Sequence, residues 1–454
     1  MANQYHFIAI GGIGMSGLAK YLIQEGFEVS GSDINDSKYL NQLKNMGAKI
    51  FIGHDKKNID KDKIIVVSSA IKADNPELIE AKRLNCTILH RSDILAQVAS
   101  NSTHKFIGFA GTHGKTTTSG MASYVIAKSN NSPSFVVGGI VPELETNAEF
   151  VDNAKLFVAE LDESDGTLVK YTPDIVVLNN LEADHLDFYK DGLKSIIETF
   201  NIFTSNLKPD AKILINNDDD GNLKLNAKNI ITFGLNDADY VAKNIDYNDG
   251  YTTFDVYHNA ILIAKSVKII LPGKHNVYNS LAVISACNEA NISPKLIIEH
   301  LSTFTGMGRR FQKVLDINGV PVYDDYAHHP TEVSATLSAM KSFTKRNVVA
   351  VFQPHRYTRL QSLWGDFKLA LEHADRLIIT DVYAASEFPI DGISSSKLAS
   401  EIKNAEYFSG SISDVAKKLF PTINNNDIVI GLGAGDITTL AKHIKIANEE
   451  LSCK

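Results

Sequence analysis

The sequence predicts an α/β protein built from three domains. The chain has 454 residues, which is too long for one hydrophobic core and corresponds to about three domains. Short apolar segments typical of buried strands alternate with segments of helical periodicity. Two of the turns that join a strand to a helix are rich in glycine, as in nucleotide-binding proteins. We place the domains at residues 1–101, 102–308 and 309–454.

The composition excludes several classes of protein. Hydrophobic residues make up 44% and charged residues 22%, as in soluble globular proteins, and the net charge of −8 gives no general attraction to nucleic acid or to anionic membranes. The three cysteines lie far apart without metal-ligand spacing, at Cys86, Cys287 and Cys453. No apolar segment is long enough for membrane insertion and no basic leader precedes the first strand, so we expect a cytoplasmic protein. A monomer and a homodimer both remain open.

The first glycine-rich turn lies between a predicted strand at 6–10 and a helix. A second strand at 27–30 ends near Asp33, at the distance where an acidic group usually meets a ribose. This pattern predicts a Rossmann-like unit that binds a diphosphate, although an α/β unit without ligand is the alternative. NAD is the usual ligand, but the turn itself specifies only a diphosphate. The glycines that fit G-x-G-x-x-G are Gly12, Gly14 and Gly17.

Further strands, predicted at 64–67 and 87–89, continue the alternation to the end of the first domain. Each is followed by a polar turn that could contact a ligand. The first of these turns contains Ser69, and the second consists of His90 and Arg91. A solvated surface pair is an equally good interpretation of the second turn.

The second glycine-rich turn opens the central domain, after a polar hinge at 100–103 and a buried strand at 104–110. Its sequence is Gly111-Thr112-His113-Gly114-Lys115-Thr116-Thr117, and an apolar-periodic helix follows. A turn of this kind directs backbone N–H groups and a helix N-terminus at one point, which suits a polyphosphate. Lys115 would reach the β- and γ-phosphates of ATP and the Thr116 hydroxyl would bind Mg²⁺, as in a P-loop.

The spacing of this turn departs from the general P-loop pattern. Two residues separate Gly111 from Gly114, whereas the general pattern has four. The alternative is an ordinary turn rich in glycine and threonine with a solvated lysine. The position between a strand and a helix favours the nucleotide site.

Two acidic segments follow predicted strands of the central domain. The strand at 156–160 leads into the acidic segment 160–165, and the strand at 175–178 leads into 179–187. Ligands gather at the carboxyl ends of parallel strands, and carboxylates are preferred Mg²⁺ ligands. Glu160 is therefore a candidate metal ligand, and His185 is a less usual one. An acidic loop in water is the alternative for either segment.

The remainder of the central domain contains alternating strands between 208 and 272, which indicate a β excursion. We expect these strands at 251–256, 260–263 and 267–271. An alanine-rich helix is expected at 280–290, and Asn276 and Asn279 just before it could read an adenine edge. Capping of the helix N-terminus explains these two residues nearly as well.

The third domain is expected to begin in the segment 306–311. Its strands at 320–323 and 348–352 end in polar loops at 324–330 and 353–359, which carry histidines, arginines and a tyrosine. Arginine has a planar fork that matches a carboxylate or a phosphate, so these loops predict an anion site in an otherwise acidic protein. A zinc site is the competing interpretation, but the loops lack acidic or cysteine ligands at metal spacing. A strand at 428–430 and a helix at 437–447 close the domain.

Together these motifs resemble the Mur ligases, ATP-dependent enzymes that form amide bonds in peptidoglycan synthesis. The resemblance covers essentially the whole chain, and the short spacing after Gly111 is the form that this family has. It implies a Rossmann-like N-terminal domain that holds a UDP-sugar and a central P-loop ATPase-type domain that holds ATP and Mg²⁺. It also implies a C-terminal Rossmann-like domain that carries an amino acid and closes over both. The segments that carry the resemblance are Gly111–Thr117, Glu160–Asp165, Glu182–His185, His275–Asn279, Gly308–Phe311 and Asp324–Pro330.

Within the family, the segments Gly11–Ala19 and Phe352–Arg359 resemble the member that couples L-alanine to the lactyl carboxylate of UDP-N-acetylmuramate. The reaction so implied begins with transfer of the γ-phosphoryl group of ATP to that carboxylate. The alanine amine then attacks the acyl phosphate and expels phosphate. The protein mainly holds oxygens in line and offsets charge in such a transfer.

The resemblance also implies roles for individual residues. Catalysis is assigned to Lys115, Glu160 and His185, and the ligands of two expected Mg²⁺ ions are Thr116, Glu160 and His185. ATP contacts are assigned to Gly111, Thr112, His113, Gly114, Lys115, Thr116, Thr117, Asn276, Asn279, Arg310 and Asp325. UDP-sugar contacts are assigned to Gly12, Gly14, Met15, Ser16, Asp33, Ser69, His90 and Arg91. Amino-acid contacts are assigned to Tyr326, His355, Arg356 and Arg359.

Three rival interpretations remain. A salvage ligase of the same family attaches a whole tripeptide to the same sugar nucleotide, and the segment His355–Arg359 argues against it. A non-catalytic switch would bind ATP without forming product. An NAD-dependent dehydrogenase explains only the first glycine-rich turn and leaves the P-loop without a role.

Overall fold

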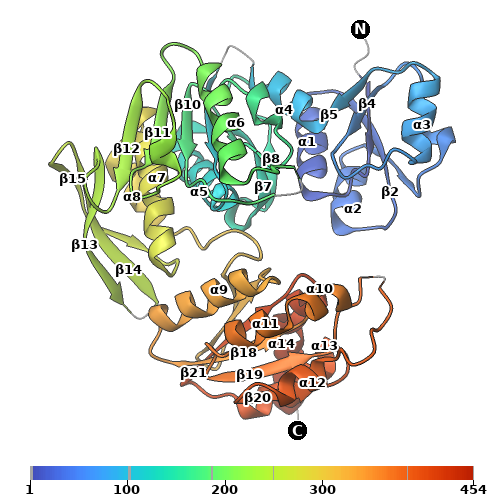
Figure 1. Ribbon diagram of the computed structural model, residues 1–454, viewed down its shortest axis with the longest axis vertical. Coiled ribbons are helices and arrows are strands. Elements are labelled where there is room, and N and C mark those ends of the chain that lie inside the picture. Colours follow the sequence, from blue (N-terminus) through green and yellow to red (C-terminus); the bar gives the residue numbers. More distant parts are fainter. Residues whose placement is uncertain (1–3, 101–103, 186–187, 249, 386, 453–454) are drawn as a thin grey trace. The chain divides into compact units, whose positions relative to one another are not determined.

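The computed structural model describes residues 4–100, 104–185, 188–248, 250–385 and 387–452. The predicted boundary at 101/102 and most of the polar hinge lie outside these residues, as do Leu186, Asp187 and Cys453. The chain forms two compact units, and each contains α/β layers (Figure 1). Unit 1 contains the described residues up to Asn244 together with 254–267 and 277–304, and unit 2 contains 245–253, 268–276 and the chain from Thr305 onward.

Unit 1 begins with a five-stranded parallel sheet of order β3-β2-β1-β4-β5. The order reverses beside β1, which pairs with both β2 and β4, and ligands bind at such switch points in open α/β sheets. The strands are β1 (Gln4–Ile8), β2 (Glu28–Asp33), β3 (Lys49–Ile52), β4 (Ile64–Val67) and β5 (Ile88–His90). The helices are α1 (Ile13–Gln24), α2 (Lys38–Asn45), α3 (Pro76–Arg83) and α4 (Arg91–Ala99), with a short 3₁₀ turn at Lys56–Asn58.

The glycine-rich turn begins earlier than the sequence predicts. The strand at 6–10 was expected to include Ile10, but β1 ends at Ile8 because Ala9 adopts a positive φ of 61°. Ile10 then packs against Gly31 of β2, where an added Cβ would lie 2.6 Å from its Cδ1 and 2.8 Å from the Phe7 carbonyl oxygen. The absence of a side chain at Gly31 therefore allows the turn to sit directly on the sheet.

Unit 1 continues into a ten-stranded sheet of order β15-β14-β13-β12-β11-β10-β6-β9-β7-β8. The strands are β6 (Lys105–Ala110), β7 (Ser134–Val141), β8 (Thr146–Glu149), β9 (Leu156–Glu160), β10 (Ile175–Leu178), β11 (Lys212–Asn216), β12 (Ile230–Gly234), β13 (Tyr240–Asn248), β14 (Tyr251–His258) and β15 (Ile261–Ile269). The α-helices that follow these strands are α5 (Lys115–Ile126), α6 (Leu193–Ser205), α7 (Lys274–Glu289) and α8 (Pro294–Leu301). Strands β13, β14 and β15 contribute residues to both units.

Two predictions for this region are wrong in detail. The strands expected at 260–263 and 267–271 are one strand, β15, which ends at Ile269. The helix expected at 280–290 begins at Lys274, because Gly273 takes a φ of 88° and lets the chain turn straight into α7. Asn276 and Asn279 therefore lie within α7 and not ahead of it.

Unit 2 contains a six-stranded sheet of order β16-β17-β21-β18-β19-β20, in which only β16 and β17 are antiparallel among the described pairings. The strands are β16 (Gln312–Ile317), β17 (Val320–Asp325), β18 (Asn347–Phe352), β19 (Arg376–Thr380), β20 (Ala405–Phe408) and β21 (Asp427–Leu432). The helices are α9 (Pro330–Phe343), α10 (Tyr357–Ser362), α11 (Trp364–Leu371), α12 (Ser395–Ser400), α13 (Ile412–Leu419) and α14 (Leu440–Ser452). Apolar clusters on both faces of this sheet form the core.

The three sheets confirm the predicted α/β class with three sheet-containing domains. The predicted strands at 64–67, 156–160 and 175–178 coincide with β4, β9 and β10. Within the described ranges, no helix combines the length and the apolar character that crossing a bilayer requires.

Candidate active site

The second glycine-rich turn joins the end of β6 to the start of α5. Gly111 and Gly114 adopt φ values of 120° and 82°, which side chains rarely tolerate. Asn180, which follows β10, holds the turn in place. The Thr112 N–H donates to the Asn180 carbonyl oxygen (2.9 Å), and the His113 N–H donates to Asn180 Oδ1 (2.8 Å). An added Cβ on Gly114 would lie 2.8 Å from Oδ1 of Asn279, so α7 packs directly against the turn. The predicted residue Asn279 therefore lies beside the predicted ATP-binding turn.

Lys115 folds back over this turn. Its Nζ donates to the carbonyl oxygens of Gly111 (2.7 Å) and Thr112 (3.0 Å) and to Oε1 of Glu163 (2.9 Å). The Lys115 side chain is only 12% exposed. Lys115, the predicted phosphate-binding cation, is thus already oriented at the turn, with the Glu163 carboxylate as its counter-ion.

Glu163 is the functional candidate that the sequence analysis left without a role. Its side chain is 2% exposed, and Oε2 has no hydrogen-bond partner within the described part of the chain. His185 Nε2 lies 3.7 Å from Oε1, and the Tyr189 hydroxyl donates to the Glu163 carbonyl oxygen (2.5 Å). Burial raises the pKa of the Glu163 carboxyl, and the charge of Lys115 opposes this rise. Lys115 and the buried Glu163 therefore form one polar group, and the partly exposed His185 lies at its edge.

Sequence reasoning had only one signal for Glu163. This residue lies in the acidic segment after β9, and β9 pairs with β6, the strand that leads into the P-loop. The loop after β9 must therefore lie beside the P-loop. That neighbour relation is a property of the sheet order, which the sequence alone does not contain.

Glu160, the predicted metal ligand, lies at the carboxyl end of β9. Its Oε2 accepts a hydrogen bond from the Gly138 N–H (2.9 Å), and an added Cβ on Gly138 would lie 2.2 Å from the same oxygen. Gly138 on β7 thus makes room for the carboxylate, a role that the sequence analysis did not identify.

The candidate Mg²⁺ ligands do not form a complete cage. Among the described residues, no group of three or more histidine, cysteine or acidic side chains could hold a metal ion. The Thr116 hydroxyl, the Glu160 carboxylate and the orphaned Glu163 Oε2 are hard oxygen donors. This set fits Mg²⁺, which usually takes one or two carboxylates and completes its shell with phosphate oxygens and water. His185, which adopts a φ of 52° beside Glu163, remains a predicted ligand only.

The same acidic loop also contacts the first sheet's loops. Asp162 forms an ion pair with Arg91, and Asp165 accepts a hydrogen bond from the Ser69 hydroxyl. His90 Nε2 lies 3.2 Å from Ser69 Oγ and 3.6 Å from Asp165 Oδ2. The structure thus brings together three of the predicted UDP-sugar contacts, and it places them next to the acidic loop.

At the first glycine-rich turn, some features fit the predicted sugar-nucleotide contacts and others serve the turn itself. The α1 N-terminus has no side-chain cap at Gly12, which leaves backbone N–H groups for an anion. An added Cβ on Gly14 would lie 3.3 Å from an Arg91 guanidinium nitrogen, so a cation stands beside the turn. Asp33 already accepts a hydrogen bond from the Gly11 N–H (2.8 Å) and so stabilises the turn itself.

Met15 and Ser16 are less accessible than their predicted role requires. Both side chains are buried in α1. The Ser16 N–H donates to the Gly12 carbonyl oxygen and its hydroxyl donates to Ile13, so both of its donors are used inside the helix. Their assignment as sugar-nucleotide contacts stays a prediction.

Unit 2 holds the remaining predicted ATP contacts. Asp325, at the end of β17, accepts hydrogen bonds from the N–H groups of Phe311 (2.7 Å) and Ala327 (2.8 Å), and its burial raises its pKa to about 6. The charge of Arg310 opposes that rise. Asp325 therefore fixes the start of the loop 326–330. Asn276 Nδ2 donates to the Pro272 carbonyl oxygen (2.7 Å) at the start of α7.

The predicted amino-acid contacts gather at the carboxyl ends of β17 and β18. An Arg359 N–H donates to His355 Nδ1 (3.1 Å), and the His355 ring stacks on Tyr383 with centroids 5.5 Å apart. Burial and the charge of Arg359 lower the pKa of His355 to about 4, so this imidazole is neutral at physiological pH. One Arg359 guanidinium nitrogen thus bonds a neutral ring and not a carboxylate, and the charge of Arg356 acts on Glu387.

The other side of these loops is formed by Tyr326, which is about one-third exposed. The Arg309 guanidinium lies over its ring at 4.7 Å from the centroid. Arg356 adopts a φ of 69°, a strained conformation of the kind found at functional sites. Among the described residues of these loops, no group of three or more histidine, cysteine or acidic side chains could hold a metal ion.

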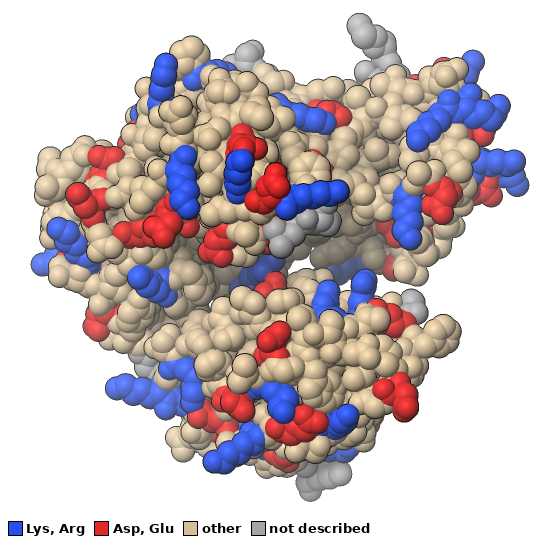
Figure 2. Space-filling model, in the orientation of Figure 1, with Lys and Arg blue, Asp and Glu red and all other residues tan. Residues whose placement is uncertain are grey.

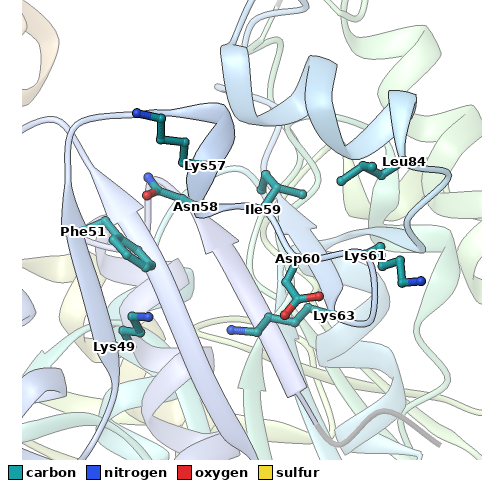
Figure 3. A pocket seen from close by; sticks show the side chains of 9 residues that line it. All are labelled: Lys49, Phe51, Lys57, Asn58, Ile59, Asp60, Lys61, Lys63 and Leu84. Atoms are coloured by element: carbon teal, nitrogen blue, oxygen red, sulfur yellow. The ribbon is translucent and has the colours of Figure 1, made fainter.

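Charge and surface shape add little to this assignment. Basic and acidic side chains are interspersed on the visible face of each unit (Figure 2). A pocket of about 370 Å³ lies beside β3 and the segment before β4 and contains none of the predicted site residues (Figure 3). Its walls carry four lysines, Lys49, Lys57, Lys61 and Lys63. Lys49 and Lys63 mark the amino ends of parallel strands, opposite to the glycine-rich turn.

Comparison with known proteins covers nearly the whole chain. Three family models match in succession: "Mur ligase family, catalytic domain" over residues 4–103, "Mur ligase middle domain" over 109–287 and "Mur ligase, glutamate ligase domain" over 309–435. A protein of Clostridium novyi named UDP-N-acetylmuramate–L-alanine ligase is 40% identical over 446 residues, covering 96% of this chain and 95% of that protein. One of the same name from Sulfurihydrogenibium is 40% identical over 97% of this chain and 98% of its own length.

Solved structures give the same picture. The UDP-N-acetylmuramate–alanine ligase MurC of Thermotoga maritima superposes with a TM-score of 0.82 and 28% identity, covering 99% of this chain and all of that one. A murein peptide ligase of Psychrobacter arcticus superposes with a TM-score of 0.65 and 23% identity, which shows a shared fold.

The Lys115–Glu163 pair generates a prediction about stability. Glu163→Ala should lower the free energy of unfolding by about 3 kcal/mol or more, because it leaves the ammonium group of Lys115 buried without its counter-ion. Glu163→Gln should cost less, since an amide oxygen can still accept the hydrogen bond from Lys115. Urea denaturation followed by circular dichroism measures both values.

The matched control is Glu182→Ala. Glu182 is 61% exposed and its partner His113 is equally exposed, so the change should stay within about 0.5 kcal/mol. Equal losses from Glu163→Ala and Glu182→Ala would contradict the buried pair.

Proposed function

Because this chain belongs to the Mur ligase family, we propose that it joins L-alanine to the lactyl carboxylate of UDP-N-acetylmuramate. The products are UDP-N-acetylmuramoyl-L-alanine, ADP and phosphate, and the reaction serves peptidoglycan precursor synthesis. Support comes from relatives of that name, about 40% identical over nearly their full length. The observation that carries the proposal is the acidic loop 162–165, which contacts both Lys115 and the predicted sugar-nucleotide loops.

The first step is phosphoryl transfer from ATP to the lactyl carboxylate. The N-terminus of α5 and the N–H groups of the turn before it bind the phosphates. Lys115 exchanges its hydrogen bond with Glu163 for one with a phosphate oxygen and so offsets the charge that the transfer redistributes. Thr116 and Glu160 would hold Mg²⁺, and His185 would help to hold a second ion. Bound Mg²⁺ would supply further positive charge that offsets the charge of the phosphates.

The sugar nucleotide is held by the first domain. Its diphosphate lies at the uncapped N-terminus of α1, where Arg91 stands beside Gly14. Ser69 and His90 hold the sugar end of the ligand. Since Asp162 and Asp165 fix Arg91 and Ser69, the lactyl carboxylate is directed to the side of the P-loop where Lys115 lies.

The amino acid is bound by the loops after β17 and β18. Arg356 and Arg359 take its carboxylate, because a planar guanidinium matches two carboxylate oxygens. Tyr326, held under the Arg309 guanidinium, limits the space for the side chain to a small group. The amine attacks the acyl phosphate, and phosphate leaves from the tetrahedral intermediate.

A salvage ligase that attaches a tripeptide is the second candidate. Solved ligases of that kind share the fold, with a TM-score of 0.59 and 28% identity over 67% of this chain for the Neisseria protein. The alanine enzyme is favoured because its named relatives match almost the whole chain at about 40% identity.

One assay separates these functions. Purified protein with ATP, Mg²⁺ and UDP-N-acetylmuramate should release phosphate rapidly only when L-alanine is added, and mass spectrometry should detect the new amide. Lys115→Ala should lower the rate by about 100-fold or more, because it removes a preorganised charge at the transferring group. Turnover with the tripeptide and none with alanine would favour the salvage reaction. ATP binding without any amide would indicate a non-catalytic switch.

A second prediction tests the amino-acid site. Arg359→Ala should raise the KM for L-alanine about tenfold or more, because a charge-assisted hydrogen bond contributes about 1.5–3 kcal/mol. The KM for ATP should stay the same. Steady-state kinetics with each substrate varied in turn measure both constants.

Arg376→Ala provides the control, since this arginine on β19 pairs with Glu406 at the surface. It should leave both KM values at the wild-type level. An unchanged KM for alanine in Arg359→Ala would remove Arg359 from the amino-acid site.

A further inference from the structure

We propose that Nε2 of His328 accepts the proton that the amino acid's ammonium group must lose before its nitrogen can attack. The proposal rests on the function proposed above and adds a chemical role at the same site. His328 lies in the loop between β17 and α9, beside Tyr326 and opposite His355. No role was assigned to it from the sequence.

The tautomer of His328 follows from one hydrogen bond. Its Nδ1 lies 2.9 Å from the carbonyl oxygen of Tyr326. A carbonyl oxygen only accepts, so Nδ1 must carry the hydrogen and donate it. A neutral ring then has its lone pair on Nε2, and no hydrogen bond to any described residue occupies that nitrogen. The ring therefore presents a free proton acceptor.

The surroundings keep this ring neutral. Burial is the main cause that lowers the pKa of His328, and the positive charges nearby lower it further. The carbonyl group of Tyr326 and the carboxylate of Glu332, which lies 3.3 Å from Nδ1, raise the pKa. The net shift is downward. The titratable and charged groups around the ring are Tyr326, His329, Glu332, His355 and Arg359. An imidazole that is unprotonated at neutral pH can take a proton from an ammonium group.

The other two histidines of these loops offer no such acceptor. His355 Nδ1 accepts a hydrogen bond from Arg359, so in the neutral ring Nε2 carries the hydrogen. His329 Nδ1 accepts from the Thr331 N–H as the N-cap of α9, which likewise leaves a hydrogen on Nε2. His328 alone among the three has the opposite tautomer.

The position of His328 suits the amine. Its ring centroid lies 6.0 Å from that of His355, which in turn bonds Arg359, a predicted anchor of the substrate carboxylate. In an α-amino acid one carbon separates the carboxylate from the nitrogen. An amino acid bound by Arg359 therefore places its nitrogen within a few ångströms of that anchor, on the loops that include His328.

The proton balance is complete without any other reagent. The ammonium group gives one proton to Nε2 of His328 and becomes a neutral amine. Its lone pair forms the N–C bond at the acyl phosphate, and the C–O bond to phosphate breaks with its electron pair. The nitrogen releases its second proton to the departing phosphate, which leaves as hydrogen phosphate. His328 returns its proton to water before the next turnover.

The test uses His328→Asn in the full-length protein with ATP, Mg²⁺ and UDP-N-acetylmuramate. The asparagine amide can still donate to the Tyr326 carbonyl oxygen, but it has no basic nitrogen at the Nε2 position. We expect kcat/KM for alanine at neutral pH to fall by about 100-fold or more, as for loss of a general base. The loss should shrink as the pH rises, because more alanine is then already a free amine.

Hydroxylamine provides a readout that a merely structural role would not move. It is largely unprotonated at neutral pH and captures an acyl phosphate as a hydroxamate without a base. His328→Asn should form hydroxamate at the wild-type rate, which also shows that the variant folds and activates the carboxylate. His329→Asn is the matched control, since asparagine is a good N-cap and alanine turnover should be unchanged.

The outcomes distinguish this proposal from the function on which it rests. If wild-type protein forms neither amide nor hydroxamate, the proposed function fails. If wild type is active and His328→Asn retains its alanine kcat/KM, or loses alanine and hydroxylamine activity alike at every pH, then His328 is not the proton acceptor.

Discussion

The ion pair between Lys115 and Glu163 is the interaction on which the organisation of this site depends. Because β9 lies next to β6, the loop after β9 must run beside the P-loop, and Glu163 meets Lys115 there at 2.9 Å. A buried carboxylate and a buried ammonium group are stable only together. The pair therefore fixes the direction of the lysine, and in the proposed reaction nucleotide binding would exchange one anionic partner for another.

The residues on either side of Glu163 extend this constraint to the first domain. Asp162 binds Arg91, and Asp165 binds Ser69 beside His90. One short loop thus connects Lys115, the cation proposed to activate the lactyl carboxylate, with the loops expected to hold the sugar nucleotide. Electrostatic preorganisation of this kind is effective because the charges need not reorient during the reaction.

Sequence reasoning predicted the parts of this site that are local and missed those that depend on strand order. The apolar segments that became β9 and β10 are continuous and bounded by polar residues, so their limits could be read directly. The role of Glu163 and the space that Gly138 provides for Glu160 arise from neighbours on other strands. A single sequence does not state which strands are neighbours. The prediction of two strands at 260–263 and 267–271 was wrong, because the polar residues of β15 interrupt its apolar pattern without interrupting the hydrogen bonds of the strand.

In the proposed reaction, the lactyl carboxylate of UDP-N-acetylmuramate is activated next to Lys115 as an acyl phosphate. This activation can be tested with UDP-N-acetylmuramate whose lactyl carboxylate oxygens carry a heavy isotope, in a complete reaction with ATP and L-alanine. Mass spectrometry of the released phosphate should find one heavy oxygen per molecule, because the carboxylate oxygen that bonds to phosphorus leaves with it. Phosphate without the label, formed together with the amide, would contradict the account.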